Sequence, residues 1–241
     1  MSGPCCVQGY IHEGTPVGSI DPSTKAYVTL PSGDYDKTKA LLFLTDIFGP
    51  ELPNGQLLAD SYAKNGLATH MPDMTDGEPF KKQDLKFGQH KRTEWFARHG
   101  KERTRATIDR VIAQLKEQGV TRFAAVGYCW GARYAVDLVL EDLVSVAAVA
   151  HPSFINIPED IEALGKTPAH FLWLHALQDF LMTAEKQKEV REILKDSPRH
   201  KHVDFDAGHT FAIRGDPADP HIRAEADRAF AEAVAFFKEH L

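Results

Sequence analysis

Cysteine is scarce in this chain, which has 241 residues and only three cysteines, Cys5, Cys6 and Cys129. Two of them are sequence neighbours and the total is odd, so the sequence predicts no disulfide framework. A chain of this kind suits a reducing compartment. Residues 1–20 lack the basic segment followed by an apolar one that marks a secretion signal. We therefore expect a cytoplasmic protein.

Long apolar runs and an excess of positive charge are also missing. No run approaches the roughly 20 apolar residues of a membrane span, so we expect no membrane partner. The chain has 28 Lys and Arg against 34 Asp and Glu, a formal net charge of -6. Binding to nucleic acid needs a clustered basic face, whereas the basic residues here are scattered. We expect no nucleic-acid partner.

The sequence contains no linker that would separate two domains and no internal repeat. Apolar residues make up 43% and charged residues 26%, which are values of a globular enzyme. We predict one domain over residues 1–241. Near the candidate catalytic residues described below, no short-spaced pair such as C-x-x-C or H-x-x-x-H occurs, so we expect no metal site.

Short apolar runs alternate with longer amphipathic ones, and several of the short runs are almost continuously apolar. Such runs are typical of strands that are covered on both faces of a parallel sheet. The alternation predicts an α/β fold, a doubly wound and mostly parallel sheet with helices on both faces. In such sheets, functional residues lie at the carboxyl ends of the strands. The predicted strands are Ala26–Leu30, Ala40–Thr45, Leu67–Met71, Phe123–Tyr128, Val144–Ala150, His170–Ala176 and His202–Asp206, and the predicted helices are 104–118, Trp130–Leu140, Ala184–Leu194 and Asp219–Leu241.

One segment, 72–100, interrupts the alternation. It follows a predicted strand and mixes Pro, Gly and charged residues with four aromatic residues, Phe80, Phe87, Trp95 and Phe96. We interpret it as a cap over the strand ends; a long surface loop is the alternative.

The strongest local signal is Gly127-Tyr-Cys129-Trp-Gly131, between an apolar strand and a helix. This pattern is typical of the nucleophile elbow of α/β-hydrolases, with Cys in place of Ser. The turn is so tight that side chains two residues before and after the nucleophile would collide, which explains both glycines. The helix N-terminus favours the thiolate, which is the reactive form of cysteine.

A nucleophile of this kind needs a base and an acid that orients the base. In this fold the chain order is nucleophile, acid, histidine. Asp179 follows one predicted strand and His209 follows the next in a Gly-His turn. They are the predicted acid and base for Cys129. Asp204 and Asp206 lie within a strand and are less suitable.

Two backbone N–H groups are candidates for the oxyanion hole, those of Trp130 and of Ile47 in the loop Thr45-Asp-Ile-Phe-Gly49. Asp46 in this loop is unexpected, because a carboxylate beside a thiol opposes formation of the thiolate. It is either a loop cap or a gate that keeps Cys129 protonated until substrate binds. His175 lies inside a strand and is interpreted as a core histidine with satisfied hydrogen bonds. His151 follows a strand and is a candidate contact for the substrate.

These motifs resemble the dienelactone hydrolase family over most of the chain, on Asp46-Ile-Phe-Gly49, Gly127-Tyr-Cys-Trp-Gly131, Asp179 and Gly208-His-Thr-Phe211. The segments 5–10 and 12–15 are similar to the fungal and yeast branch. The resemblance implies an α/β-hydrolase fold and hydrolysis of a lactone or ester through an acyl enzyme on Cys129, without a cofactor. We expect a monomer or homodimer whose partner is a small-molecule ester or lactone.

The chain departs from the family pattern at two positions. Bacterial members have Glu where Asp46 stands, and a shorter side chain leaves activation of the thiol to His209. The family arginine that holds a substrate carboxylate corresponds to Arg214, one residue further along the chain than in bacterial members. The substrate-binding candidates are therefore Arg214, Phe211 and His151. Arg92, Arg98 and Arg133 are candidates for a second arginine.

Three alternatives remain open at this point. The first is a broader carboxylester or thioester hydrolase that acts on a lipid or a secondary-metabolite ester. The second is a non-catalytic relative of the α/β-hydrolases that serves as a binding module. The third, a metal site formed by Cys129, His209 and others of the twelve histidines, is disfavoured by the ligand spacing.

Overall fold

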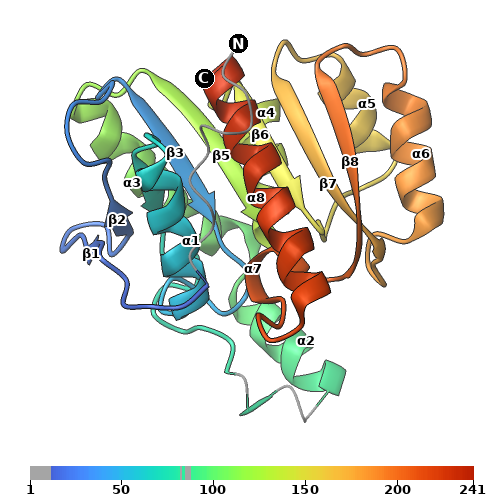
Figure 1. Ribbon diagram of the computed structural model, residues 1–241, viewed down its shortest axis with the longest axis horizontal. Helices are drawn as coiled ribbons and strands as arrows, with labels where there is room; N and C mark the ends of the chain where they lie inside the picture. Colours follow the sequence, from blue (N-terminus) through green and yellow to red (C-terminus); the bar gives the residue numbers. More distant parts are fainter. Residues whose placement is uncertain (1–11, 82, 85–87) are drawn as a thin grey trace.

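The computed structural model describes residues 12–81, 83–84 and 88–241. Cys5, Cys6 and Phe87 lie outside the described residues. Helices and strands alternate through most of the chain (Figure 1). The strands are β1 (Ser19–Ile20), β2 (Tyr27–Thr29), β3 (Lys39–Leu44), β4 (Thr69–Met71), β5 (Arg122–Tyr128), β6 (Val146–Ala150), β7 (His170–Gln178) and β8 (His200–Gly208). The helices are α1 (Pro53–Lys64), α2 (Gly88–Arg98), α3 (Lys101–Glu117), α4 (Gly131–Leu140), α5 (Glu159–Gly165), α6 (Ala184–Leu194), α7 (Phe211–Arg214) and α8 (Pro220–His240).

The strands form one sheet in the order β1-β2-β4-β3-β5-β6-β7-β8. All pairings from β4 to β8 are parallel, whereas β1 and β2 join the sheet antiparallel. The predicted doubly wound, mostly parallel α/β fold is confirmed. Because β3, β5, β6, β7 and β8 run in the same direction, their carboxyl ends meet at one edge of the sheet.

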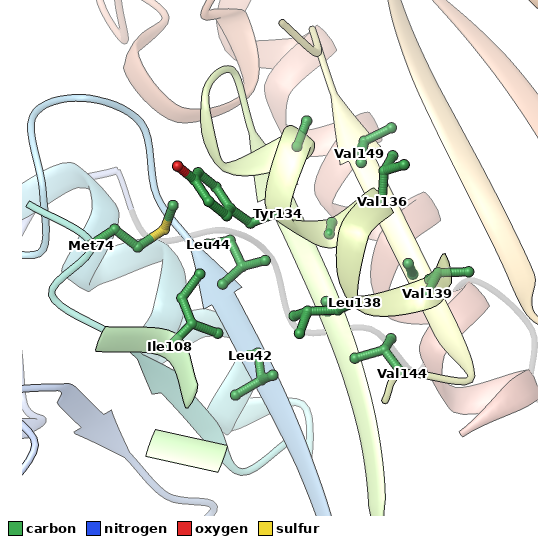
Figure 2. Close-up of a cluster of buried hydrophobic side chains, with 14 of the residues drawn as sticks. Leu42, Leu44, Met74, Ile108, Tyr134, Val136, Leu138, Val139, Val144 and Val149 are labelled. Carbon is green, nitrogen blue, oxygen red and sulfur yellow. The ribbon is translucent and has the colours of Figure 1, made fainter. Parts of the chain in front are cut away.

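Both faces of the sheet are covered by helices, and this explains the nearly continuous apolar strands. Side chains alternate between the faces along β3: Leu42 and Leu44 pack in one core cluster, and Leu41 and Phe43 pack in the other. The first cluster contains residues of α3, α4, α5 and α6, and the second contains residues of α1, α7 and α8. Figure 2 shows part of the first cluster, with Leu42 and Leu44 of β3 beside Ile108 of α3 and Leu138 of α4. Helix α8 crosses in front of the strands in Figure 1.

The longest helix, α8, follows from standard helix signals. Asp219 caps it by accepting hydrogen bonds from the backbone N–H groups of His221 and Ile222, and Pro220 occupies the first turn. Its buried residues recur at helical spacing, at Ala226, Ala229, Phe230, Ala233, Val234 and Phe237. This stripe packs on the sheet.

The sequence analysis did not predict β1, α1, α2, α5 and α7. Helix α1 escapes the pattern because it is buried on nearly all sides, including the polar Asp60 and Ser61. Asp60 accepts hydrogen bonds from the Tyr27 hydroxyl at 2.8 Å and from the Val17 N–H at 2.8 Å. Because such polar residues lie on the buried side of α1, the sequence does not show the regular alternation of apolar and polar residues that marks an amphipathic helix.

Within 72–100, the predicted cap contains α2 and packs against the segments that follow β3 and β5. The buried Trp95 lies 5.0 Å from Trp130 and 6.2 Å from Phe80, measured between ring centroids. Phe80 lies 6.1 Å from Phe48. The aromatic residues thus hold this segment against the two loops that carry the candidate oxyanion donors. Its function as a cap stays a prediction.

His175 is buried as expected, and its Nε2 lies 3.0 Å from Nδ1 of His202. Its own Nδ1 has no partner within the part of the chain that the structure describes. The interpretation of a fully satisfied core histidine therefore holds for only one of its two nitrogens. Burial lowers the pKa of His175 strongly, so the ring is neutral and needs no counter-charge.

The close contact between α4 and β3 leads to a first prediction. A Cβ on Gly131 would overlap the backbone oxygens of Leu44 and, at 2.7 Å, of Thr45. Backbone cannot move aside cheaply, so Gly131→Ala should lower the free energy of unfolding by about 3 kcal/mol or more. Urea denaturation measures this change.

Gly100→Ala is the matched control, because a Cβ there meets nothing within 4 Å. We expect it to cost less than about 1 kcal/mol. Equal stability of the two variants would contradict the close contact.

Candidate active site

The candidate nucleophile lies between the end of β5 at Tyr128 and the start of α4 at Gly131. Cys129 has a positive φ of 51°. A residue other than glycine rarely adopts such a backbone angle unless its surroundings impose it. Its N–H donates to Ala150 O at 3.2 Å, and its carbonyl accepts from Ser153 N at 3.1 Å. A Cβ on Gly127 would lie 2.7 Å from Ala132 Cα. The two glycines and the neighbouring strand therefore fix the turn.

The three predicted triad residues come together at the edge where β5, β7 and β8 end. The Sγ atom of Cys129 lies 3.1 Å from Nε2 of His209. Nδ1 of His209 lies 2.9 Å from each carboxylate oxygen of Asp179. Asp179 Oδ1 also accepts from the N–H groups of Leu181 at 2.8 Å and Met182 at 3.2 Å, which fixes the carboxylate. The geometry is a continuous chain from carboxylate to imidazole to sulfur.

The electrostatics of His209 follow from these contacts. Burial of the ring opposes its charge, but the hydrogen bonds to Asp179 and Cys129 outweigh burial and raise the pKa of His209 to about 9. At neutral pH the ring is therefore an imidazolium. Its Nδ1–H points at Asp179, so its Nε2–H points at the sulfur.

The two residues that carry the candidate oxyanion donors, Ile47 and Trp130, are buried. Trp130 is the residue after Cys129, and Ile47 lies in the loop after β3. Within the described ranges, neither backbone N–H donates a hydrogen bond to another group of the chain. Both N–H groups are therefore free to donate to a negative charge that develops on a substrate oxygen.

Asp46 and Arg214, predicted for separate roles, form an ion pair. The carboxylate of Asp46 is fully buried, and its Oδ2 accepts from Nε of Arg214 at 2.5 Å. Its Oδ1 accepts from the Phe48 N–H at 3.0 Å. Arg214 Cζ lies 4.4 Å above the Phe48 ring. In the described part of the chain, Sγ of Cys129 contacts His209 and Ser153 rather than Asp46.

His151 and Phe211 are both buried; His151 packs against His209, and Phe211 packs against His151. The His151 ring is 5.1 Å from that of His209 and 5.8 Å from that of Phe211. Burial lowers the pKa of His151 well below its ordinary value, and the charges of His209 and Arg214 act in the same direction. This packing suits a supporting role; contact of either ring with substrate stays a prediction.

The arginines considered for a second substrate contact differ in availability. Arg133 bonds to Asp160 and, at 2.8 Å, to Asp137, so its charge is already balanced. Arg98 lies 3.8 Å from Glu78 on the surface. Arg92 is exposed on α2.

Sequence reasoning missed three residues near the sulfur and the imidazole. Ser153 Oγ lies 3.5 Å from Cys129 Sγ. Phe154 and Phe180 are exposed and follow Ser153 and Asp179 directly. The available signal was their position, because each lies just past the carboxyl end of a parallel strand.

Among the described residues, no group of three or more His, Cys, Asp or Glu side chains is arranged to hold a metal ion. A search of the same residues finds no helix that is long and apolar enough to span a membrane.

The buried ion pair leads to a second prediction. Arg214→Gln leaves the Asp46 carboxylate buried without its counter-charge, and we expect a loss of roughly 2–4 kcal/mol in the free energy of unfolding, because Arg214 is partly exposed. The double variant Asp46→Asn/Arg214→Gln should recover most of this loss. Urea denaturation of the four proteins of the cycle measures the coupling.

Arg191→Gln provides the control, since the Arg191–Asp204 pair lies on the surface. It should change stability by less than about 0.5 kcal/mol. An Arg214→Gln variant as stable as this control would show that the buried pair does not stabilise the fold.

The chain resembles known hydrolases over nearly its whole length. The profile of the dienelactone hydrolase family matches residues 24–241. The chain is 32% identical to "Hydrolase pyvD" of Aspergillus violaceofuscus, covering 98% of this chain and 96% of the relative. It is 31% identical to "Dienlactone hydrolase 1" of Gibberella moniliformis, covering 90% and 85%.

Solved structures agree on the fold. A dienelactone hydrolase described as putative, from Klebsiella pneumoniae, superposes with a TM-score of 0.71 at 17% identity, covering 89% of this chain and 92% of that one. At this identity the likeness shows the fold alone. The profile and the relatives carry the family assignment: the chain belongs to the dienelactone hydrolase family and is a hydrolase that acts on ester or lactone bonds.

Proposed function

We propose that this protein hydrolyses a lactone or ester through a Cys129–His209–Asp179 triad. The observation that carries the proposal is the unbroken chain of contacts from Asp179 through His209 to Sγ of Cys129, at 2.9 and 3.1 Å. The strained turn at Cys129 presents the sulfur at the N-terminus of α4, where the helix dipole favours a thiolate.

In the proposed first half-reaction, the Cys129 thiolate attacks the carbonyl carbon. The electron pair of the C=O bond moves to oxygen, and the N–H groups of Ile47 and Trp130 bind the oxyanion. When the tetrahedral intermediate collapses, the C–O bond to the leaving group breaks. The His209 imidazolium gives its proton to that oxygen, and a thioester on Cys129 remains.

The second half-reaction uses the same groups in reverse. Neutral His209 takes a proton from water, and the hydroxide attacks the thioester. The C–S bond breaks, the carboxylic acid leaves, and the thiolate–imidazolium pair is restored. These steps use only groups of the chain and water.

One proposed role of Asp46 is to keep the Cys129 thiol protonated until substrate binds. The contacts of Asp46 determine how it could do so. Because Arg214 and the Phe48 N–H hold its carboxylate, Asp46 must leave both partners before it can act on the sulfur. The alternative role for Asp46 is that of a loop cap. The bond from the Phe48 N–H, two residues along the chain, supports that role. The cytoplasmic location and the monomeric or dimeric state stay predictions.

Two substrate classes deserve testing. Resemblance to the family favours a carboxylate-bearing dienelactone, with Arg214 as the contact for the carboxylate. The pairing of Arg214 with Asp46 favours the second class, a neutral ester, because the charge of the arginine is already balanced.

The proposed mechanism predicts the effect of triad variants. Wild type should hydrolyse a dienelactone or a simple ester, and Cys129→Ala should abolish turnover without loss of the fold. Asp179→Asn should lower kcat by roughly 10³- to 10⁴-fold, because the imidazole loses its tautomer and orientation. Absorbance-based kinetics and circular dichroism measure both quantities.

Asp206→Asn is the matched control, since Asp206 is an exposed carboxylate on β8 that bonds to Gln178. It should retain the rate of wild type. Turnover by Cys129→Ala at the wild-type rate would refute the proposed nucleophile.

The raised pKa of His209 gives a prediction about pH. Titration of the imidazole C–H by NMR should show a pKa of about 9 in wild type and a lower value in Asp179→Asn. The folded pKa lies above the ordinary 6.5, so protonation of His209 stabilises the fold fully below pH 6.5. That contribution is lost as the pH rises towards 9.

The difference in unfolding free energy between wild type and Asp179→Asn should accordingly shrink between pH 6.5 and 9. A difference that stays constant across this range, with His209 titrating near its ordinary pKa in both proteins, would contradict the assignment.

A further inference from the structure

Phe154, in the loop after β6, has an unfavourable backbone conformation, and its apolar side chain is exposed to solvent. Phe154 has a φ of 60°, a region that bulky side chains rarely adopt, and 53% of its surface is exposed. Neighbouring groups impose this conformation. Arg133 donates to the Phe154 carbonyl at 3.3 Å and is itself fixed by Asp160 and Asp137. Asp160 also binds the Asn156 N–H at 2.6 Å.

This ring belongs to an aromatic cluster that begins at the nucleophile. Phe154 follows Ser153, whose Oγ is 3.5 Å from Cys129 Sγ. Its ring lies 4.9 Å from that of Phe96 in an edge-to-face arrangement, at 66°. Phe96 in turn lies 6.2 Å from Trp130, the residue that follows the nucleophile.

A second exposed aromatic ring adjoins the other member of the reacting pair. Phe180 follows Asp179, is 69% exposed, and lies 5.1 Å from the His209 ring. Leu181, next in the chain, is 38% exposed. His209 thus has an exposed aromatic ring 5.1 Å away, and the residue that hydrogen-bonds to Cys129, Ser153, is followed by another. Neither Phe180 nor Phe154 belongs to the two core clusters.

Two arginines near this surface already have carboxylate partners. Arg133, beneath the Phe154 loop, is paired with Asp160 and Asp137, and Arg214 is paired with Asp46. A surface of this kind attracts an uncharged apolar group more than a carboxylate. Exposed aromatic rings on the loops that follow β6 and β7, at the same edge as the candidate triad, suit an aromatic partner, because rings pack edge to face or offset at 4.5–7 Å.

We propose that Phe154, supported by Phe96, and Phe180 form a subsite that binds an uncharged aromatic ring of the ester or lactone substrate. This subsite deepens the proposed function and rests on it. Phe154 and Phe180 are specificity-determining residues, and the backbone conformation of Phe154 is maintained because it presents the ring to the substrate.

The test uses alkylation of Cys129, which requires a reactive thiol but no hydrolysis. Three reagents share one electrophile: 2-chloroacetamide, N-benzyl-2-chloroacetamide and N-(chloroacetyl)glycine. In each, the thiolate sulfur of Cys129 displaces chloride and forms a thioether, and chloride leaves as the anion while His209 stays protonated. Each rate is divided by the rate of the same reagent with N-acetylcysteine, and mass spectrometry locates the adduct.

Wild type should prefer the benzyl reagent over 2-chloroacetamide by roughly tenfold, a preference typical of a ring that enters an apolar site. Phe154→Gly and Phe180→Ala should each bring the ratio close to one. Glycine tolerates a φ of 60°, so Phe154→Gly should keep or raise thermal stability. Leu30→Ala is the control, since Leu30 is 50% exposed and follows β2 at the opposite edge of the sheet.

Several outcomes would overturn the proposal. They are a wild-type ratio near one, a preference for the carboxylate reagent, or folded variants that keep the preference for benzyl. A change in sedimentation of Phe154→Gly with an unchanged ratio would assign this surface to contact between copies of the chain.

Hydrolysis of methyl phenylacetate and methyl acetate separates this proposal from the proposed function. Cys129-dependent hydrolysis without selectivity for the aromatic ester refutes the subsite alone. Selective alkylation without any ester hydrolysis refutes the proposed function and keeps the subsite as a site for aromatic ligands.

Discussion

The active site depends on one close approach between backbone segments. Gly131 lets the first turn of α4 touch the end of β3, where a side chain would overlap the carbonyls of Leu44 and Thr45. That contact fixes the loop after β3, which carries Ile47, against the turn that carries Cys129 and Trp130. The proposed nucleophile and both proposed oxyanion donors are therefore positioned by the same packing constraint. The positive φ of Cys129 is the local strain that accompanies it.

Around this turn, the protein balances each buried charge with a specific partner. Asp179 is matched by His209, and Asp46 by Arg214. His151, between these two pairs, stays neutral because burial and two neighbouring positive charges lower its pKa. A charged group of a substrate can bind in this region only if it displaces one of these partners. The pairing of Arg214 with Asp46 therefore disfavours a substrate carboxylate at Arg214.

Much of the fold and of the triad could be predicted from the sequence, for identifiable reasons. Strands covered on both faces are nearly continuously apolar, and the Gly-x-Cys-x-Gly turn admits few residue types. The carboxyl ends of parallel strands lie at one edge of the sheet. Asp179 and His209 could therefore be predicted as the candidate acid and base from their positions after two strands. Helix α1 could not, because buried polar residues satisfied by distant groups conceal its period.

Contacts between residues distant in sequence were equally hidden. Asp46 and Arg214 are separated by 168 positions, and no local pattern links them. The exposure of Phe154 depends on a loop held by Arg133 and Asp160, which only the folded chain brings together. Local signals thus predicted the candidate catalytic residues, while tertiary packing decides which groups surround them.

The most direct test of the central claim is to trap the covalent intermediate. Protein quenched in acid during steady-state turnover of an ester is digested, and the peptides are mapped by mass spectrometry. The account predicts one acyl group attached to Cys129. Continued hydrolysis with Cys129 unmodified at every quench time, or with the acyl group on another residue, would contradict it.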